Sequence, residues 1–372
     1  MRSNQTFSPA RFIDPVLLFP VILLTGIGII MVYSASSEIA LRQFGSEYYF
    51  FSRQLAYLAI GLTVMIIACF VPYGIYRSTT YVFLLAAVIL LGALLIDGVG
   101  QTAGGATRWL RFGWISFQPV EFARLALIIF LAYSLTKKQC QVERPTIGFL
   151  PHVIVLLLFS VMIMMQPDFG TIVIFWMMAW IIMFAGRVPV VHLVSAFVLM
   201  LPFALWLLFA AEYRIKRYIT FLDPWKYPQD EGYQIIHAMM AFNSGGIFGK
   251  GLGEGFQKLF YLPAPHTDFI FSVIGEEGGL ALVLLVIALF LVILWRGLQI
   301  AASAEDCFAS FLAFGITISI AIQAVVNMGV NLSLLPTKGL TLPFLSFGGS
   351  SLVFNLVGIG ILMNIGARRG LK

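Results

Sequence analysis

The sequence predicts an all-α polytopic membrane protein, with about ten transmembrane helices and one large extracytoplasmic loop between helices 7 and 8. Of its 372 residues, 60% are hydrophobic and only 11% are charged, whereas about 25% of the residues of a soluble domain are charged. Apolar runs close to the ~20 residues that cross a bilayer recur along the chain. A long polar interval at residues 213–268 interrupts them. We therefore expect residues 1–372 to form a single membrane domain, with residues 213–268 as its large outer loop.

Ten apolar segments are read as membrane spans, with ends defined to within a few residues. They are Pro15–Ser34, Leu55–Val71, Thr80–Ile96, Val120–Leu135, Phe149–Met165, Phe169–Ala185, Val191–Ala211, Phe269–Leu294, Phe308–Leu332 and Leu352–Ile365. An even number of spans puts both termini on one side of the membrane. Basic residues at the C-terminus and at residues 137–144 indicate that this side is the cytoplasm.

The outer loop Asp97–Gln118 is rich in glycine and is expected to consist of turns. It places cations beside aromatic rings, at Arg108 and Trp109 and again at residues 111–114. One interpretation is an aromatic belt at the membrane interface. The other is a lid over a polar headgroup, and the sequence leaves both open.

The fourth span begins with Glu121 and Arg124, which are three residues apart and so share one helix face within pairing distance. The pair either only lowers the cost of inserting two charges or faces an internal cavity. Asp168 follows a proline and precedes the sixth span, a position that favours N-capping of that helix over catalysis.

The large loop divides into three parts. The first carries the cations Arg214 and Arg217 with aromatic residues that would anchor it at the membrane surface. The second, Gly232–Phe242, is too short to span and is expected to form an interfacial helix. The third, Gly245–Gly255, is glycine-rich around Lys250 but lacks the Ser or Thr that follows the lysine of a P-loop. Its backbone amides either cradle a phosphate or form a flexible hinge.

The loop ends by placing His266, Thr267 and Asp268 at the mouth of the eighth span. A carboxylate costs roughly 2.5–3.5 kcal/mol at the centre of a membrane helix and less near the interface, which makes Asp268 a functional candidate. Glu276 and Glu277 follow inside this span. They point about 100° apart, so at least one is expected to face the protein interior. Lys338 lies in a last outer loop, of apolar, re-entrant character.

Several functional classes are not indicated. The chain has no Asp-x-Asp pair, no Walker lysine and no His/Cys cluster with zinc spacing, so no nucleotide donor, cofactor or metal site is identifiable. The net charge of +6 comes from scattered residues without a basic stripe, which does not indicate nucleic-acid binding. These cations are better suited to anionic headgroups or a phosphate-bearing lipid.

Taken together, the motifs resemble those of the SEDS family (shape, elongation, division and sporulation) over nearly the whole chain. The segments that carry the resemblance occur in the family's order: Thr107–Trp109, Gln118–Glu121, Gln166–Thr171, Gly232–Gln234, Gly245–Gly253, Tyr261–Pro263, His266–Glu277 and Ser346–Ser351. Within the family, Leu335–Phe344 is more similar to the cell-division branch than to the elongation branch. Ala264 stands where many members have glutamate, Arg124 where lysine is common and His237 where glutamine is usual.

The resemblance implies a ten-helix peptidoglycan glycosyltransferase in the cytoplasmic (inner) membrane of a bacterium. It would polymerise lipid II on the outer face during septal cell-wall synthesis, together with a class B penicillin-binding protein transpeptidase and other membrane proteins of the divisome. Asp268 matches the aspartate that is considered essential in the family.

The chemistry of this reaction suggests a role for each of the candidate site residues. A sugar hydroxyl must attack an anomeric carbon while a pyrophosphate leaves, and Asp268 is expected to act as general base. Arg108, Arg214, Arg217 and Lys250 are the candidate cations for the pyrophosphate. Glu121 and Arg124 would orient the cavity. Trp109, His266, Thr267, Glu276 and Lys338 complete the set of supporting residues.

Three further points stay open. A divalent cation, Mg²⁺ or Mn²⁺, could bind the pyrophosphate of the substrate, although the sequence contains no identifiable set of metal ligands. Buried charges would suit a flippase for lipid-linked precursors equally well, but no inverted repeat is evident. A scaffold that only recruits a partner would leave Asp268 without a purpose.

Overall fold

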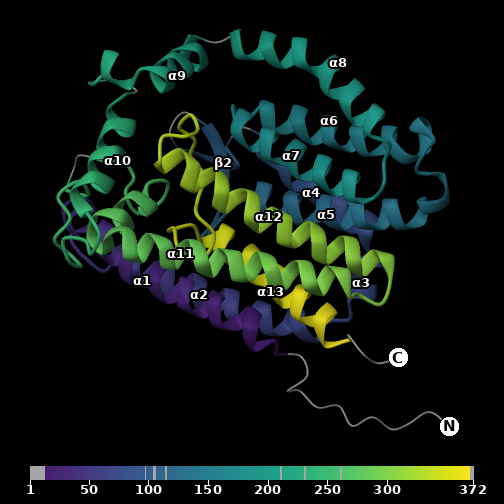
Figure 1. The fold of residues 1–372 in the computed structure, drawn as a ribbon, viewed down its shortest axis with the longest axis horizontal. Coiled ribbons are helices and arrows are strands. Elements are labelled where there is room, and N and C mark those ends of the chain that lie inside the picture. The colour runs from purple at the N-terminus through teal and green to yellow at the C-terminus, as the bar shows by residue number, and fades with distance from the viewer. Residues whose placement is uncertain are drawn as a thin grey trace.

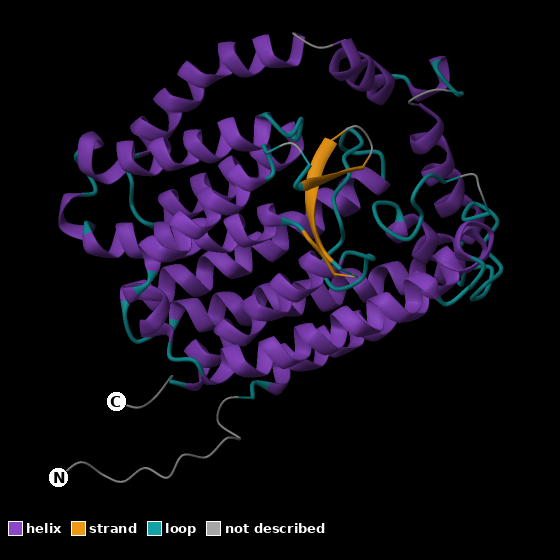
Figure 2. Cartoon of the chain, turned by 180° about the vertical axis from the view of Figure 1, so that it is seen from behind, coloured by secondary structure: helices purple, strands orange, loops and turns teal. Residues whose placement is uncertain are grey.

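The computed structural model describes residues 13–96, 98–103, 106–113, 115–209, 212–229, 232–259 and 262–368. It is a bundle of long helices, and the described chain begins at residue 13 and ends at residue 368 at the same end of this bundle (Figure 1). A small sheet lies at the other end, among the loops (Figure 2).

Seven helices in the described part of the chain are long and apolar enough to cross a membrane. They are α1 (Pro15–Phe44), α2 (Tyr49–Phe70), α5 (Pro119–Lys137), α6 (Leu150–Met164) with the π-helical turn before it (Pro145–Phe149), α11 (Ile270–Ala302), α12 (Cys307–Asn331) and α13 (Gly349–Ala367). Three more helices are apolar: α4 (Thr80–Ala93), α7 (Phe169–Ala185) and α8 (Val190–Phe209). Each of the ten predicted spans overlaps one of these helices, so a helical, multi-pass membrane architecture is confirmed.

Shorter helices connect the long ones. They are α3 (Tyr73–Ser78), the 3-10 turns Gln139–Gln141 and Pro224–Lys226, α9 (Glu212–Leu222) and α10 (Gly232–Gly245). The helix predicted at Gly232–Phe242 is therefore present as α10. Together α8 and α9 form an arch that stands away from the rest of the bundle in Figure 1.

The segment predicted as a turn-rich loop contains a sheet instead. Its antiparallel strands are β1 (Gly100–Ala103), β2 (Ala106–Phe112) and β3 (Ile115–Phe117), in the order β1-β2-β3. Thr, Trp, Ile and Phe favour strands, and Gly113 provides the left-handed turn between β2 and β3 at φ +62°. The glycines thus mark short turns within a meander, and the protein is not purely α-helical.

The sheet is attached to the bundle through α2. The hydroxyl of Tyr57 accepts a hydrogen bond of 2.7 Å from the backbone N–H of Ser116, in β3. Ser350, at the start of α13, accepts one of 2.9 Å from the backbone N–H of Gln118. These contacts position β2, and therefore Arg108, over the end of the helices.

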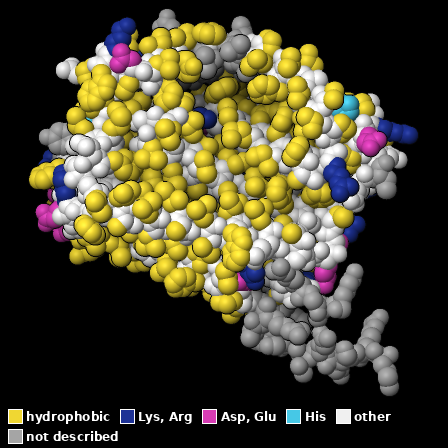
Figure 3. All heavy atoms as spheres, viewed as in Figure 1, with side chains coloured by type: hydrophobic (Ala, Val, Ile, Leu, Met, Phe, Trp, Pro, Cys, Tyr) yellow, Lys and Arg dark blue, Asp and Glu magenta, His cyan; other side chains and the backbone are white. Residues whose placement is uncertain are grey.

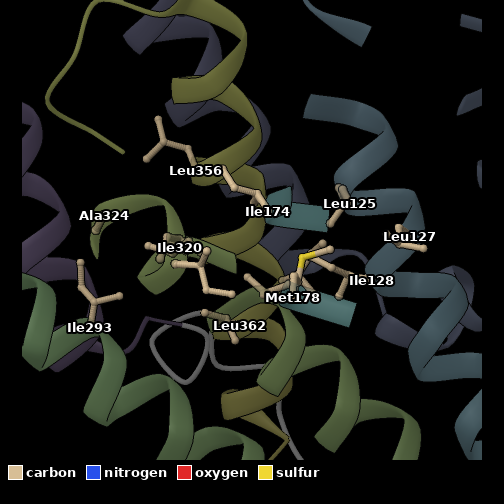
Figure 4. Packing of buried hydrophobic residues seen from close by; sticks show 14 of the residues in the cluster. Leu125, Leu127, Ile128, Ile174, Met178, Ile293, Ile320, Ala324, Leu356 and Leu362 are labelled. Atoms are coloured by element: carbon tan, nitrogen blue, oxygen red, sulfur yellow. The ribbon is translucent and has the colours of Figure 1, made fainter. Parts of the chain in front are cut away.

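The core of the bundle lies where α5, α7, α12 and α13 meet. Figure 4 shows Ile128 of α5, Met178 of α7 and Ile320 of α12 close together, and all three are buried. Close approach of the helices is possible because small residues face their neighbours: a Cβ added at Gly315 of α12 would lie 2.6 Å from Ile128. In a membrane such close packing, rather than the hydrophobic effect, holds helices together.

Candidate active site around Asp268

Asp268 lies two residues before the start of α11, at the end of the bundle opposite the start of α1 (Figure 1). Its carboxyl group is partly buried, and the loss of solvent raises its pKa from 3.8 to about 6. A hydrogen bond from Thr267 and the positive charge of Arg108 act in the opposite direction. A carboxylate with this pKa is ionised at neutral pH and is a stronger base than an exposed aspartate.

Two asparagines of α12 hold the backbone of Asp268. Asn327 and Asn331 each donate a side-chain hydrogen bond to its carbonyl oxygen, at 3.1 and 2.9 Å. Asn331 also accepts hydrogen bonds from the backbone N–H and the hydroxyl of Ser272, at 3.1 and 2.8 Å. Sequence reasoning missed both asparagines, although two amides four residues apart in an apolar span are a signal of an internal polar network.

The last outer loop closes over the carboxylate. A Cβ added at Gly339 would lie 3.3 Å from Oδ2 of Asp268, so any larger residue at this position would crowd the carboxylate. The neighbouring Lys338 packs on Gly170, at the start of α7, and its ammonium group donates to the Gly170 carbonyl at 3.4 Å. Burial lowers the pKa of Lys338, whereas the charge of Asp168 raises it.

Arg108 joins this group from β2. Its Nε lies 3.4 Å from Oδ2 of Asp168, and its Nη2 donates to the carbonyl of Pro167 at 3.0 Å. Asp168 also accepts from the backbone N–H of Thr171 at 3.2 Å, which confirms its predicted N-cap role. Trp109 is the next residue of the strand, and its side chain therefore points to the opposite face of the sheet from Arg108.

His266 and Thr267 are built into the wall of the site. The imidazole of His266 lies between Phe50 and Phe347, with ring centroids 4.4 and 5.8 Å away. Burial lowers the pKa of His266 to about 4, so the ring is neutral at physiological pH. The carbonyl of Thr267 accepts a hydrogen bond of 2.6 Å from Ser346. These contacts join the motif to the segment before α13.

Glu121 and Arg124 form the predicted pair, at 2.6 Å and both buried. They line a small cavity between α5, α12 and α13. A chain of hydrogen bonds leads from it toward the loop of Lys338: Arg124 to Asn355 at 3.5 Å, Asn355 to Ser351 at 3.2 Å, and Thr341 to Ser351 at 2.9 Å. The pair is thus connected to the site through polar side chains.

Other candidates have different surroundings. Lys250 and Glu276 pair with each other at 3.1 Å. The backbone amide of Gly253, and those of residues 256 and 257 just after the glycine-rich segment, donate to glutamate carboxylates. The predicted phosphate cradle is therefore occupied by the protein's own anions. Arg217 is exposed on α9, whereas the side chain of Arg214 lies outside the described part of the structure.

The surface is hollowed beside the arch of α8 and α9 (Figure 3). Figure 3 shows a depression between the arch of α8 and α9 and the body of the bundle, with a Lys or Arg side chain at its floor and hydrophobic side chains around it. A basic floor with apolar walls suits a ligand that has an anionic head and a hydrocarbon tail. Within the described residues, no group of three or more His, Cys, Asp or Glu side chains is arranged to hold a metal ion.

Fold and site together define a polytopic membrane protein with a carboxylate, two nearby cations and an apolar depression at one end. Residues 15–370 match the family model described as "Cell cycle protein" and named for FtsW, RodA and SpoVE. The chain belongs to this family, which confirms the resemblance to the SEDS proteins.

The relatives extend over almost the whole chain. The chain is 44% identical over 355 residues to the "Probable peptidoglycan glycosyltransferase FtsW" of Geobacter metallireducens, covering 95% of each protein. It is 41% identical over 352 residues to the "Stage V sporulation protein E" of Bacillus subtilis, covering 95% of this chain and 96% of that protein.

Two solved structures share the fold. One is a chain from a study of the "structural coordination of polymerization and crosslinking by a peptidoglycan synthase complex", with a TM-score of 0.79, 27% identity, and coverage of 96% of this chain and 99% of that one. The other is the rod shape determining protein RodA of Thermus thermophilus, with a TM-score of 0.70, 25% identity, and coverage of 96% and 98%.

Proposed function

We propose that the protein is a peptidoglycan glycosyltransferase that polymerises lipid II during septal cell-wall synthesis, with Asp268 as general base. The observation that carries the proposal is the surroundings of the Asp268 carboxyl, whose pKa is raised to about 6. The last outer loop places Lys338 on one side of the site, and strand β2 places Arg108 near it. The relatives named peptidoglycan glycosyltransferase support the substrate and the reaction. Their designation as FtsW supports division rather than elongation.

The chemistry requires a base on one side and cations on the other. A sugar hydroxyl gives its proton to Asp268 while its oxygen forms a bond to the anomeric carbon of a second lipid II. The bond from that carbon to the pyrophosphate breaks, and the polyprenyl pyrophosphate leaves with the electron pair. Positioned base catalysis contributes roughly 10²–10⁴-fold to such a step.

Arg108 and Lys338 are the cations that we assign to the leaving pyrophosphate. These residues are coupled electrostatically, since the charge of Arg108 lowers the pKa of the Asp268 carboxyl and the charge of Asp168 raises the pKa of the Lys338 ammonium group. Partial burial strengthens their attraction to a developing charge. Lys250 is left out of this role because Glu276 already pairs with it.

The ten-span topology is part of the proposal. In it, all ten apolar helices cross the membrane, both termini are cytoplasmic, and the residues between α8 and α11 form the outer loop.

The proposal also includes partners. A class B penicillin-binding protein would dock beside the site, which the likeness to a chain of a peptidoglycan synthase complex supports. Other divisome membrane proteins would complete the assembly. A divalent cation, Mg²⁺ or Mn²⁺, would bind the pyrophosphate of the substrate.

The test is polymerisation of lipid II by purified protein with its class B partner, from which any transglycosylase domain has been removed. Wild type should form glycan strands, and Asp268→Asn should form none while remaining folded in the membrane. Asp223→Asn is the matched control, because Asp223 is exposed on the same loop. Strands made by Asp268→Asn at the wild-type rate would refute the assignment.

A flippase for lipid II is the second candidate. The buried pair Glu121–Arg124 and the polar chain through Asn355 favour it, since such groups suit a translocation path. Translocation of fluorescent lipid II in vesicles, without strands in the polymerisation assay, would support the flippase.

Addition of EDTA to the polymerisation assay tests whether the reaction needs a divalent cation.

A further inference from the structure

Two adjacent glutamates near the start of α11 are completely enclosed by donors from elsewhere in the chain. Glu276 has no exposed surface and Glu277 has 1%. The carboxylate of Glu276 accepts four hydrogen bonds of 3.0–3.2 Å, from Lys250, Ser244 and the backbone N–H groups of Phe256 and Gln257. A carboxylate satisfied in this way has no oxygen left for a substrate.

Glu277 has an equally complete set of partners. Its carboxylate accepts from the ammonium group of Lys258 at 2.6 Å, from the hydroxyl of Ser34 at 2.8 Å and from the backbone N–H of Gly253 at 3.0 Å. Lys258 is itself buried and donates to Ser34 at 2.8 Å. The two glutamates therefore join the glycine-rich segment to α11 and to α1 at once.

The backbone of the same segment fills a break in α11. Gly279 has non-helical angles, φ +66° and ψ −169°, which free backbone groups on both sides of it. Residues of the loop pair with these groups: Lys250 N with Glu276 O, Gly251 N with Glu277 O, Leu280 N with Gly246 O, and Ala281 N with Ile247 O, at 2.9–3.1 Å. A Cβ at Gly249 would lie 2.1 Å from the carbonyl oxygen of Glu277, which explains why glycine is needed there.

A continuous path leads from this attachment to Asp268. The backbone N–H of Gln257 binds Glu276, and the backbone carbonyl of Gln257 accepts from Leu262 N at 2.9 Å. Leu262 belongs to a small buried cluster with Phe269, the residue after Asp268. The side chain of Gln257 also contacts His237 of α10 at 2.7 Å. The chain before Asp268 is thus anchored at Glu276 and Glu277, and the chain after it by α12.

We propose that Glu276 and Glu277 are positioning residues for Asp268, and that residues 244–258, which include the glycine-rich segment, form a binding site for these two internal carboxylates. This proposal rests on the proposed glycosyltransferase function. Removal of one partner leaves a buried charge unpaired, which is strongly destabilising to the local structure. A shift of about 1 Å at a reacting group can lower a rate by about 100-fold.

The first experiment compares Glu277→Gln, Lys258→Met and the double variant in the lipid II polymerisation assay. Glu277→Gln should lower kcat by roughly 10- to 100-fold and leave KM for lipid II within about twofold of wild type, because no substrate contact is lost. The double variant should regain a large part of kcat, since neither charge is then buried alone. Glu254→Gln, an exposed glutamate in the same loop, should behave like wild type.

A second experiment needs no activity. Limited proteolysis of the protein in nanodiscs should cut residues 246–259 faster in Glu277→Gln than in wild type, and the double variant should be protected again. An unchanged kcat in a variant whose loop is cut faster would overturn the positioning role. A raised KM without rescue by Lys258→Met would instead make Glu277 a substrate contact. Absence of polymerisation by wild type would refute the proposed function, whereas the proteolysis result would still test the attachment.

Discussion

The side-chain amide of Asn331 donates a hydrogen bond of 2.9 Å to the backbone carbonyl of Asp268, 63 residues earlier in the chain. Through this contact α12 determines where the carboxylate of Asp268 stands. The same asparagine accepts from Ser272 in the first turn of α11, so it also aligns the start of that helix. A catalytic group on the end of a loop acquires the rigidity of two membrane helices in this way.

Replacement of Asn331 by alanine should therefore reduce both stability and activity. Ser272 and the Asp268 carbonyl would lose buried partners, at a cost of about 1–3 kcal/mol for an unsatisfied group. We expect a lower Tm and a loss of polymerisation of up to about 100-fold. Asn243→Ala, on the exposed side of α10, is the control for both measurements. Full activity of Asn331→Ala would show that the position of Asp268 does not depend on α12.

Polymerisation should depend on pH through Asp268. Below its pKa of about 6 the carboxyl is protonated and does not accept a proton. The rate should rise through pH 6 and level off above pH 7. Because Arg108 lowers this pKa, Arg108→Gln should move the midpoint to higher pH as well as lower the plateau. An unchanged midpoint in Arg108→Gln would contradict the electrostatic contact.

The same pKa affects stability. The pKa of the Asp268 carboxyl is about 6 in the folded protein, above its ordinary value of 3.8, so the folded state binds this proton more tightly. The resulting stabilisation is fully present below pH 3.8 and is lost as pH rises through about 6, and at higher pH the buried carboxylate costs folding free energy. Asp268→Asn removes this cost. Its Tm should exceed that of wild type by more at pH 8 than at pH 4.5, as measured by thermal unfolding in nanodiscs. An equal Tm difference at both pH values would contradict the raised pKa.

Gly339→Ala should impair catalysis without unfolding the protein. The added methyl group would lie 3.3 Å from Oδ2 of Asp268, where it displaces the carboxylate or the loop of Lys338. We expect kcat to fall by about tenfold or more. Gly26→Ala is a matched control, because a Cβ at Gly26 meets no atom within 4 Å. Wild-type kcat in Gly339→Ala would place this loop away from the reacting groups.

The pair Glu121–Arg124 can be tested by a double-mutant cycle. Glu121→Ala leaves Arg124 buried without its partner at 2.6 Å, which is typically worth about 3–5 kcal/mol. Replacing both residues with alanine should cost less than the Glu121 change alone, by thermal unfolding and by polymerisation. A more damaging double variant would show that each residue has its own role. Arg124→Lys should be nearly silent if charge alone matters.

Local patterns were sufficient for much of the protein. The ten apolar segments, the N-cap at Asp168, the pairing of Glu121 with Arg124 and the position of Asp268 at the mouth of a span could all be predicted. Each depends on hydropathy or on residues within a few positions of one another. The strands at residues 100–117 could not be predicted, because glycines indicate turns and each strand between them has only a few of the Thr, Trp and Phe residues that favour a strand.

Tertiary structure alone decided which distant residues meet. Arg108 and Lys338 approach Asp268 from a strand and a loop, and Asn331 reaches it from another helix. Lys250 is near enough in sequence to be grouped with the site, yet in the folded protein it forms an ion pair with Glu276. Hydropathy and capping act over one or two helical turns, whereas these contacts depend on how the helices pack. The sequence determined that this protein spans a membrane and carries an acid at one end, and the packing determined which partners that acid has.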